Sequence, residues 1–411
     1  MPTIDEQVEI LMSGAAYGDA QTREVMKREL RERLLESEKH GRPLRVYCGY
    51  DPRTSDLHLG HTITMRKLKQ FQEFGHDVTF LVGTFTSLIG DPSDKDKARD
   101  QLTPEQVDEN ARTYAEQAFK ILDRELTRVR RNDEWLSTLD FADIIRLASN
   151  FTVQQFLVRE NFARRIEDGQ PIYLHELFYG LMQGYDAVAQ EADVQIGGQD
   201  QLFNILVAGR KLQEALGQRP QIAIIMGESL PGTDGEIKMS KSLGNHIPLL
   251  SEPWDMFGKV MSVPDKAMVI YHKLILGWSP AQLKELEDGL VTESLHPNEA
   301  KMRLAREIVT VFHSPTDADA AQKRWDEVFR SGGLPSDIEE EALETEEKLT
   351  DLLRRLNMVA SGAEARRLIE QNGVRLNDVL VTDSKWKVTF DMLPAVLQVG
   401  KRKFIRLVAK S

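Results

Sequence analysis

Two histidines flank a glycine in the stretch Asp56-Leu-His58-Leu-Gly60-His61. Residues 44–50 before it are mostly apolar and predict a buried strand, and residues 62–74 after it have the periodicity of a helix that ends at Gly75. A turn from a strand into a helix presents free backbone N–H groups and the positive end of the helix dipole. Imidazole donors beside a residue without a side chain can therefore bind phosphate and a flat nucleobase. The alternative is a chance helix cap.

A second candidate is the pentapeptide Lys238-Met239-Ser240-Lys241-Ser242, which glycine-containing segments flank on both sides. Two lysines three residues apart, among small hydroxyl side chains, predict a mobile cationic loop that suits phosphate charge. A solvated surface loop is the alternative for lysines so spaced, but the complete pentapeptide is a much rarer pattern. The histidine turn and the lysine loop together resemble the class I aminoacyl-tRNA synthetases.

Tyr179, Gln183 and Asp186 are spaced so that all three lie on one face of a helix predicted at residues 179–189. The apolar neighbours of this helix, and the buried strand predicted at 192–197, favour a polar cluster that lines a pocket over a solvated face. Here the resemblance narrows to the tyrosyl-tRNA synthetases of the bacterial type. It rests on Tyr47-Cys48-Gly49-Tyr50-Asp51-Pro52, Ile89-Gly90-Asp91-Pro92-Ser93, the helix triplet, and Gly197-Gly198-Gln199-Asp200-Gln201.

The resemblance implies a tyrosine–tRNA ligase, which activates L-tyrosine with ATP to tyrosyl-adenylate and pyrophosphate, and then transfers tyrosine to the terminal adenosine of tRNA(Tyr). It implies tyrosine-binding residues Tyr47, Asp91, Tyr179, Gln183, Asp186 and Gln201. It implies ATP-binding residues Cys48, Gly49, Asp51, His58, Gly60, His61, Thr64, Gly198, Asp200, Lys238 and Lys241. It implies catalytic residues His58, His61, Lys95, Arg99, Lys238 and Lys241.

Within these sets, Asp186 and Tyr47 would meet the phenolic hydroxyl of the substrate, while Tyr179, Gln183 and Asp91 would hold its ammonium group and Gln201 would lie near its carboxylate. A buried carboxylate that loses a phenol partner is left unpaired, which costs about 1–3 kcal/mol. The tyrosine carboxylate would attack the α-phosphate in line, so the protein supplies positioning and charge rather than a nucleophile. We expect Mg²⁺ to arrive with ATP, because no set of ligands at metal spacing is evident.

Three residues depart from the pattern of this family. Arg53 stands where threonine is more usual, and Asp94 replaces a glycine beside Lys95. Asp96 adds a further negative charge next to that lysine. We therefore expect Asp94 and Asp96 to change how Lys95 is presented to a ligand.

Composition predicts a globular chain of two or three domains, with 411 residues of which 41% are hydrophobic and 29% charged. Cys48 is the only cysteine, which excludes an internal disulfide and favours a reducing compartment. The acidic first residues do not resemble a secretory signal, and no run of about 18 apolar residues predicts a membrane span. The cytoplasm is the expected location.

The expected fold is α/β, with a Rossmann-like parallel-sheet catalytic domain, an α-helical domain and a small α+β domain. Residues 1–41 read as a charged helical extension that packs outside the catalytic core. A Gly/Pro break at 331–335, followed by an acidic run, predicts a linker. The predicted parts are 1–41 (extension), 42–247 (catalytic, with a helical insertion near 132–175), 248–332 (helical, on the anticodon side), 333–348 (linker) and 349–411 (tail).

The tail is basic, whereas the rest of the chain is acidic. Residues 351–411 carry 12 Lys/Arg and 6 Asp/Glu, whereas the rest of the chain carries 41 and 59, although the whole chain has a net charge of −12. The tail resembles the S-four-type RNA-binding domain that ends bacterial tyrosyl enzymes, and Arg354, Arg355, Arg366 and Arg367 are its candidate phosphate contacts. Affinity for tRNA should then fall steeply with salt. A small dimerisation domain with solvated charge is the alternative.

Three rival functions are considered. A tryptophanyl-tRNA synthetase shares the fold and the lysine loop, but Tyr47, Asp186 and the tail argue against it. A small-molecule adenylyltransferase also uses such a histidine turn, yet it would leave the helical region and the basic tail without a purpose. A non-enzymatic RNA-binding paralogue would not need the intact histidines and lysines. The resemblance also implies a homodimer, for which residues 132–175 are the candidate interface.

Overall fold

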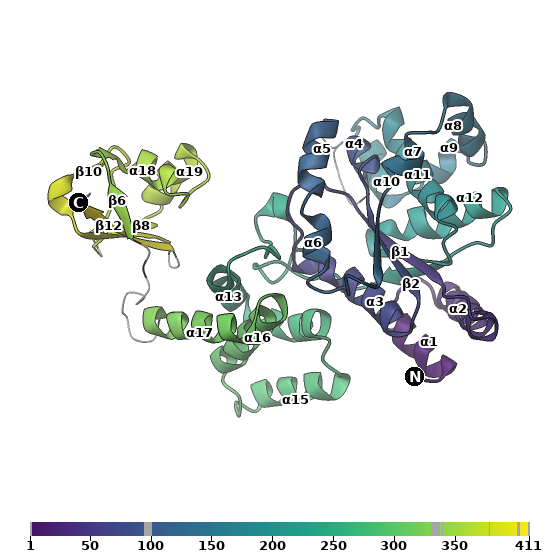
Figure 1. The fold of residues 1–411 in the computed structure, drawn as a ribbon, viewed down its shortest axis with the longest axis horizontal. Coiled ribbons are helices and arrows are strands. Elements are labelled where there is room, and N and C mark those ends of the chain that lie inside the picture. The colour runs from purple at the N-terminus through teal and green to yellow at the C-terminus, as the bar shows by residue number, and fades with distance from the viewer. Residues whose placement is uncertain are drawn as a thin grey trace. The chain divides into compact units, whose positions relative to one another are not determined.

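The computed structural model describes residues 2–93, 101–329, 338, 340–377, 379–400 and 403–409. The chain forms two compact units (Figure 1). The first contains Met1–Ser251 and Val263–Ala300, and the second contains Glu252–Ser262 and Lys301–Ser411. The segment predicted as one helical domain, 248–332, thus contributes to both units. No helix in the described part of the chain is long and apolar enough to cross a membrane.

A five-stranded parallel sheet lies at the centre of the first unit, in the order β3-β2-β1-β4-β5. Its strands are β1 (Arg45–Tyr50), β2 (Asp77–Val82), β3 (Thr127–Arg131), β4 (Val194–Gly198) and β5 (Ile222–Met226). All but β3 are largely buried, as parallel strands covered on both faces are. Because β2 lies on one side of β1 and β4 on the other, the carboxyl ends of β1 and β4 flank the crevice where such folds bind ligands. The predicted parallel-sheet class is confirmed.

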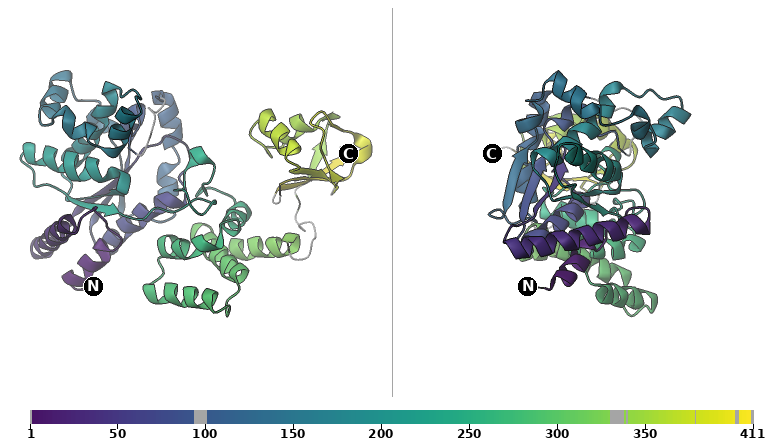
Figure 2. Two further views of the ribbon diagram at one scale, coloured as in Figure 1. Left: turned by 180° about the vertical axis from the view of Figure 1, so that it is seen from behind. Right: turned by 90° about the vertical axis from the view of Figure 1, so that its right-hand side faces the viewer.

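Helices cover both faces of this sheet (Figures 1 and 2). Helix α3 (Thr62–Glu73) packs across β1, β2 and β4, at the position predicted from its periodicity. On the opposite face, Met182 and Ala187 of α11 (Leu174–Ala189) pack with Tyr47 of β1. Side chains alternate along a strand. Tyr47 therefore faces α11, whereas the Tyr50 hydroxyl lies 2.8 Å from the Thr64 hydroxyl of α3.

The remaining elements of the first unit are mostly short helices. They are α1 (Ile4–Met12), α2 (Ala20–His40), η1 (Leu59–His61), α4 (Thr86–Ile89), α5 (Pro104–Ala111), α6 (Tyr114–Ala118), α7 (Asp133–Leu136), α8 (Phe141–Ala148), α9 (Val153–Leu157), α10 (Glu160–Glu167), η2 (Gln199–Gln201), η3 (Phe203–Gly209), α12 (Arg210–Ala215), η4 (Lys241–Leu243), η5 (Asp265–Ala267), α14 (Met268–Tyr271), η6 (His272–Leu276) and α15 (Pro280–Val291). Helix α16 (Pro297–Phe312) passes from one unit into the other.

The N-terminal helices are part of the catalytic unit rather than an appendage outside its core. Arg33 of α2 donates to Asp193 at 2.5 Å, and both side chains are buried. Asp193 also accepts the backbone N–H of Arg45 at 3.0 Å, just before β4. The hydroxyl of Tyr17 donates to the carbonyl of Ala223 in β5 at 2.6 Å. Paired buried charges of this kind are costly to separate, so α2 is firmly anchored to the sheet.

Strand β3 was not predicted. Its sequence, Thr-Arg-Val-Arg-Arg, has three arginines and little apolar surface because it forms an edge of the sheet. Each arginine pairs with a carboxylate, as in Arg128 with Asp77 at 3.0 Å. Charged side chains on an edge strand discourage pairing with other chains. The helical segment after β4 changes type along its length, since η2, a π-helix (η3) and α12 follow one another there.

In the second unit, α13 (Pro253–Met261) packs on α17 (Pro315–Phe329). The tail has a sheet in the order β6-β12-β11-β8-β9, a β7–β10 pair and two helices. Its elements are β6 (Glu340–Leu343), β7 (Glu347–Lys348), α18 (Leu349–Arg355), α19 (Gly362–Glu370), β8 (Val374–Leu376), β9 (Val379–Leu380), β10 (Lys387–Val388), η7 (Phe390–Met392), β11 (Ala395–Val399) and β12 (Lys403–Ala409).

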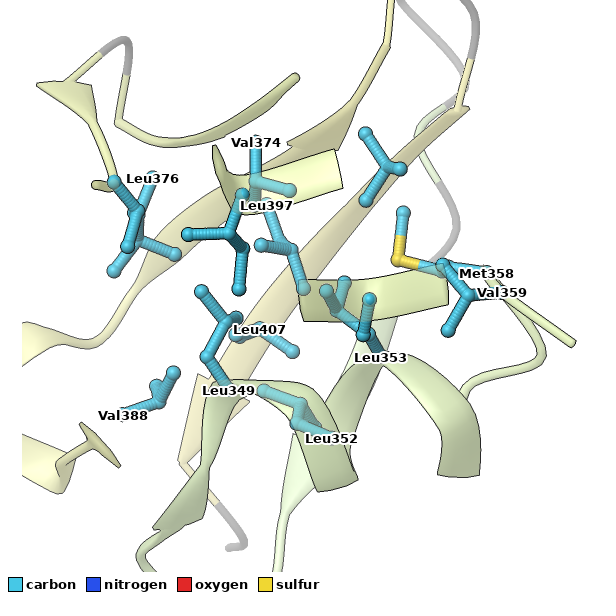
Figure 3. Packing of buried hydrophobic residues seen from close by; sticks show 14 of the residues in the cluster. Leu349, Leu352, Leu353, Met358, Val359, Val374, Leu376, Val388, Leu397 and Leu407 are labelled. Carbon is cyan, nitrogen blue, oxygen red and sulfur yellow. The ribbon is translucent and has the colours of Figure 1, made fainter. Parts of the chain in front are cut away.

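Figure 3 shows the apolar core of this tail, in which Leu349, Leu353 and Leu407 meet from α18 and β12. The predicted linker is partly structured, because β6 lies within it and pairs in parallel with β12. Strand β6 was not predicted, because two of its four residues are glutamates. Its last side chain, Leu343, is nevertheless buried. Strand β11 also escaped prediction. Linker residues 333–337 and 339 lie outside the described part.

Candidate active site

A cavity of about 1180 Å³ opens at the carboxyl ends of β1 and β4. The predicted tyrosine, ATP and catalytic residues that the structure describes all line it. They are Tyr47, Cys48, Gly49, Asp51, His58, Gly60, His61, Thr64, Asp91, Tyr179, Gln183, Asp186, Gly198, Asp200, Gln201, Lys238 and Lys241. Lys95 and Arg99, with Asp94 and Asp96, lie outside the described residues. Sequence motifs separated by up to about 190 residues thus converge at one edge of the sheet.

The histidine turn is a 3₁₀ segment that leads directly into α3. Burial lowers the pKa of His61 to about 4 and that of His58 well below its usual range, so both rings are neutral at pH 7. The backbone N–H of His58 donates to Nδ1 of His61 at 3.1 Å, which leaves the His61 proton on Nε2. His61 can therefore donate a hydrogen bond to phosphate without carrying charge.

The histidine turn and the lysine loop are joined through the backbone. Leu59 N–H donates to the Ile247 carbonyl at 3.0 Å, and Leu249 N–H donates to the Leu57 carbonyl at 2.9 Å. Lys241 Nζ lies 3.0 Å from Asp56, immediately before the histidine turn. Lys238 Nζ lies 3.6 Å from Asp200 at the end of β4. Both lysines thus face carboxylates at the edge of the cavity, where incoming phosphate would compete for them.

Asp186 is the most isolated carboxylate in the cavity, with 3% of its surface exposed. It accepts hydrogen bonds from Trp135 Nε1 at 2.8 Å and from Asn132 Nδ2 at 3.3 Å. Burial nevertheless raises the pKa of Asp186 to about 8, against the opposing effect of these two donors. Asp186 therefore exchanges a proton near neutral pH, and a further donor would favour its ionised form.

Two buried polar atoms of the cavity lining have no hydrogen-bond partner among the described residues. They are the hydroxyl of Tyr47 and Oε1 of Gln183. Tyr47 is 2% exposed, and its hydroxyl feels the charge of Asp186. Buried polar groups are almost always paired in folded proteins, so the cavity suits a ligand with polar groups.

Tyr179 holds the end of β1. Its hydroxyl donates to Oδ2 of Asp51 at 3.1 Å, and the other oxygen of Asp51 accepts from the Thr86 hydroxyl at 2.7 Å. The backbone of Gly83 passes so close that a Cβ there would lie 2.0 Å from Asp51. Asp51 is thus fixed between α11 and the end of β2, which is a stronger constraint than a turn residue before Pro52 would need.

A second carboxylate cluster lies near the end of β4. Asp91 accepts the Ser93 backbone N–H at 2.8 Å and the Gln201 side-chain amide at 2.6 Å. The same amide nitrogen lies 3.1 Å from Asp200. Burial raises the pKa of Asp91, and the charge of Asp200 adds to the effect. A Cβ on Gly198 would lie 2.6 Å from the carboxylate of Asp200, so a side chain there would displace Asp200.

The smaller predicted ATP contacts have ordinary structural partners as well. Thr64 donates to the carbonyl of His61 at 3.0 Å, within the first turn of α3. Burial raises the pKa of Cys48 to about 11, so its thiol stays protonated at neutral pH. A Cβ on Gly60 would lie 3.1 Å from the His58 ring, so a side chain at this position would push on that ring. Arg53, the departure from the family pattern, lines the cavity and donates to the carbonyl of Ser87 at 2.7 Å.

Sequence reasoning missed Asn132, Trp135 and Arg159. Asn132 and Trp135 follow the unpredicted edge strand β3, so nothing in their local pattern marked them as partners of Asp186. Arg159 lines the cavity, is 7% exposed and donates to the Ser93 hydroxyl. The buried charge at the start of α10 is visible only in three dimensions. Among the described residues, no group of three His, Cys, Asp or Glu side chains could hold a metal ion.

Residues 38–330 match the family described as tRNA synthetases class I (W and Y), and residues 347–393 match the S4 domain. The first match spans well over half of the chain, which therefore belongs to this family of class I synthetases.

Curated relatives narrow the assignment. The chain is 47% identical to the tyrosine–tRNA ligase of Moorella thermoacetica over 384 residues, which are 93% of this chain and 92% of that protein. It is 45% identical to the tyrosine–tRNA ligase of Carboxydothermus hydrogenoformans over 411 residues, 98% of each. Within the family, the chain is of the bacterial tyrosyl type.

The fold also resembles a solved structure. A C-terminally truncated mitochondrial tyrosyl-tRNA synthetase of Aspergillus nidulans superposes with a TM-score of 0.62 and 22% identity, over 80% of this chain and 95% of that one. At this identity the likeness shows the fold alone, and the chemistry of the site has to be inferred from the side chains that line the cavity.

Proposed function

We propose that the chain activates L-tyrosine with ATP and transfers the tyrosyl group to the terminal adenosine of tRNA(Tyr). The observation that carries this proposal is Asp186, a buried carboxylate of the cavity lining near Tyr47, whose hydroxyl has no partner among the described residues. A phenol can donate to Asp186 and accept from Tyr47. Membership of the family and identity to tyrosine–tRNA ligases over nearly the full chain support the same function.

The backbone end of tyrosine would lie nearer β1 and β4. The unpartnered Oε1 of Gln183 can accept from an ammonium group, and Asp91 supplies a negative charge for it. Tyr179 contributes through its hold on Asp51 and its place beside the same ligand. Gln201 would lie near the tyrosine carboxylate. These polar partners and the phenol-binding end would together fix the carboxylate for attack on the α-phosphate.

ATP would occupy the half of the cavity between the histidine turn and β4. The ribose would lie near Cys48, Gly198 and Asp200. Adenine and the phosphates would contact Gly49, Asp51, Gly60 and Thr64, with neutral His58 and His61 as donors. Mg²⁺ would enter with ATP, bound mainly to phosphate oxygens.

The chemistry would depend on charge placed near the triphosphate. The attacking carboxylate is already ionised, so no protein group acts as nucleophile or base. Negative charge grows on the α-phosphate and the leaving pyrophosphate, and Lys238 and Lys241 are placed to stabilise it once they exchange their carboxylate partners for phosphate. Lys95 and Arg99 belong to the same proposal.

Tyrosine-dependent exchange of pyrophosphate into ATP tests the proposal. We expect exchange with tyrosine and none with tryptophan or phenylalanine at equal concentration. Lys241→Ala should slow the exchange by about 100- to 1000-fold, because one donor to the transition state is removed. Tyrosine binding, measured by calorimetry, should stay unchanged. Lys266→Ala is the matched control, because Lys266 pairs with Glu236 on the surface and does not line the cavity. An undiminished exchange rate would remove Lys241 from the mechanism.

The pH dependence of tyrosine binding tests the role of Asp186. Its pKa of about 8 leaves the side chain largely neutral at pH 6. A phenol that donates to Asp186 favours the ionised form, so binding releases a proton. The Kd for tyrosine should therefore fall as the pH rises from 6 to 8, by up to about tenfold per unit. Phenylalanine has no such donor, and its affinity should not rise.

Asp186→Asn is the control for this titration, because it keeps the shape of the side chain and cannot ionise. The variant should bind tyrosine with little dependence on pH between 6 and 8. A wild-type affinity for tyrosine that weakens over this range would mean that Asp186 acts as a neutral acid, contrary to the proposal.

The rival functions fit the cavity less well. Tryptophanyl enzymes share the family and the fold, but an indole N–H can only donate. It would leave the Tyr47 hydroxyl without an acceptor. A small-molecule adenylyltransferase would not account for the S4 match, and a non-catalytic RNA-binding paralogue would not account for a cavity that keeps both lysines.

A homodimer is part of the proposal. Elements of the insertion leave apolar side chains exposed, and Phe141 and Val158 are 78% and 74% exposed. The set is Phe141, Ile145, Val153, Val158, Ile166, Tyr173 and Leu174. Such exposure is unusual unless another surface covers it, and a second copy of the chain would bury the same side chains on both partners.

Phe141→Glu should shift the protein toward monomer in light scattering. Val291→Glu, at an 82% exposed site on α15, should not. Equal masses for both variants and the wild type would refute this interface.

The tail would bind tRNA through phosphates. Arg354, Arg366 and Arg367 are exposed, whereas Arg355 is held by Glu347 at 2.7 Å. Replacing Arg366 and Arg367 with alanine should weaken tRNA binding and reduce the slope of log affinity against log salt by about 1.4–1.8. Arg355→Ala should change that slope less, because its charge is already paired. A slope unaffected by the double change would exclude these contacts.

A tRNA partner and a single free thiol favour the cytoplasm.

A further inference from the structure

Gln201 lies between two carboxylates and donates to both. Its Nε2 is 2.6 Å from Oδ2 of Asp91 and 3.1 Å from Oδ2 of Asp200. An amide nitrogen has two hydrogens, so both donors are used and the amide oxygen points away from the acids. That oxygen accepts a hydrogen bond from Nδ2 of Asn204 at 3.1 Å. The three bonds run in one direction, from Asn204 through Gln201 to the carboxylates.

We propose that Asn204 is a positioning residue, which holds the amide of Gln201 so that its NH₂ group stays between Asp91 and Asp200. A reversed amide would present its oxygen to two carboxylates. An amide that swung away would leave those acids beside each other without a shared donor. The inference rests on the proposed function, in which Asp91 holds the ammonium group of tyrosine and Asp200 lies at the ribose of ATP.

The surroundings of Asn204 make it a rigid support. Its side chain is 0% exposed and lies in the π-helix Phe203–Gly209, a widened turn of the kind often found at functional sites. A Cβ on Gly180 of α11 would come within 3.3 Å of its Oδ1 and within 3.0 Å of the Phe156 ring. Helix α11 therefore packs closely on Asn204, and Gly180 directly follows Tyr179 of the cavity.

Charges around the cluster explain why the amide matters. Asp91 is partly buried, accepts the Ser93 N–H, and faces the negative charge of Asp200 and the positive charge of Arg159. Lys238 lies on the far side of Asp200 at 3.6 Å. The neutral side chain of Gln201 donates to both Asp91 and Asp200, and so stabilises two negative charges that lie close together in the cavity. Without a fixed donor there, Asp91 would hold a proton more readily and would bind an ammonium group less well.

A simpler role for Asn204 would be to fill space next to Gly180. The two roles differ in one respect. A packing role affects stability and activity whatever stands at position 201, whereas a positioning role requires the Gln201 amide. A double-mutant cycle separates them.

The experiment measures tyrosine-dependent pyrophosphate exchange and thermal unfolding for four proteins. They are the wild type, Asn204→Leu, Gln201→Met and the double variant. Asn204→Leu keeps most of the volume and removes the donor. It should lower kcat/KM for tyrosine on the order of tenfold, mainly through KM, as expected for an amide oxygen left unpaired. In the Gln201→Met background the same change should alter kcat/KM by less than about twofold. Asn204→Ala, made in both backgrounds, serves if the leucine variant does not fold.

The outcomes are distinct. A loss confined to the Gln201 background supports the positioning role. An equal loss in both backgrounds, or no loss in either, overturns it and leaves Asn204 as a packing residue. Absence of tyrosine-dependent exchange in the wild type would overturn the proposed function itself, and the inference with it. Exchange in the wild type with an equal loss in both backgrounds overturns the inference alone.

Discussion

The site depends on the pairing of β1 with β4. These strands come from the two halves of the catalytic sequence, and their register pairs Val46 with Val194 and Tyr47 with Gln195. The pairing brings the turn after β1 and the turn after β4 to the same edge of the sheet, where the order of strands reverses. Most of the described side chains proposed to contact ATP or tyrosine come from β1, from one of these turns, from a helix packed on the sheet, or from the lysine loop. A slip of one residue between β1 and β4 would turn Tyr47 away from α11.

The second constraint is charge. Asp51, Asp91, Asp186 and Asp200 all line one cavity, and close carboxylates destabilise one another unless donors separate them. Side-chain donors serve all four carboxylates. Asp51 has two hydroxyls, and Asp186 has an indole and an amide. Asp91 and Asp200 share one glutamine. The raised pKa values of Asp91 and Asp186 show that these donors offset burial only in part. A substrate that donates a hydrogen bond would lower the remaining cost of burying these ionised carboxylates. A substrate without such a donor would not, so the same interaction would favour binding of one substrate over another.

Much of the fold followed from local pattern. Strand β1, helix α3, helix α11 and strand β4 have clear apolar patterns, so their positions could be predicted. Strands β3 and β6 could not, because edge positions allow arginine and glutamate where central strands require valine or isoleucine. The break of the helix after Gln201 into a π-helix also leaves no periodic signal. Within the π-helix, the carbonyl of Ile205 accepts from the side-chain amide of the distant Gln221 at 3.3 Å. Side chains outside the motifs, such as Asn132, Trp135 and Arg159, enter the cavity only through tertiary structure.

The fold alone does not separate tyrosine from tryptophan, because the family contains enzymes for both. In the proposed binding mode, the direction of hydrogen bonding at Asp186 and Tyr47 would distinguish the substrates. Asp186 already accepts two donors and can accept a third. The Tyr47 hydroxyl can both donate and accept. A phenolic hydroxyl would satisfy both groups at once, whereas an indole N–H would satisfy one and phenylalanine neither. Selectivity would then follow from the number and direction of buried hydrogen bonds, and apolar side chains of α11 and β1 would strengthen it by keeping water from substituting for the phenol.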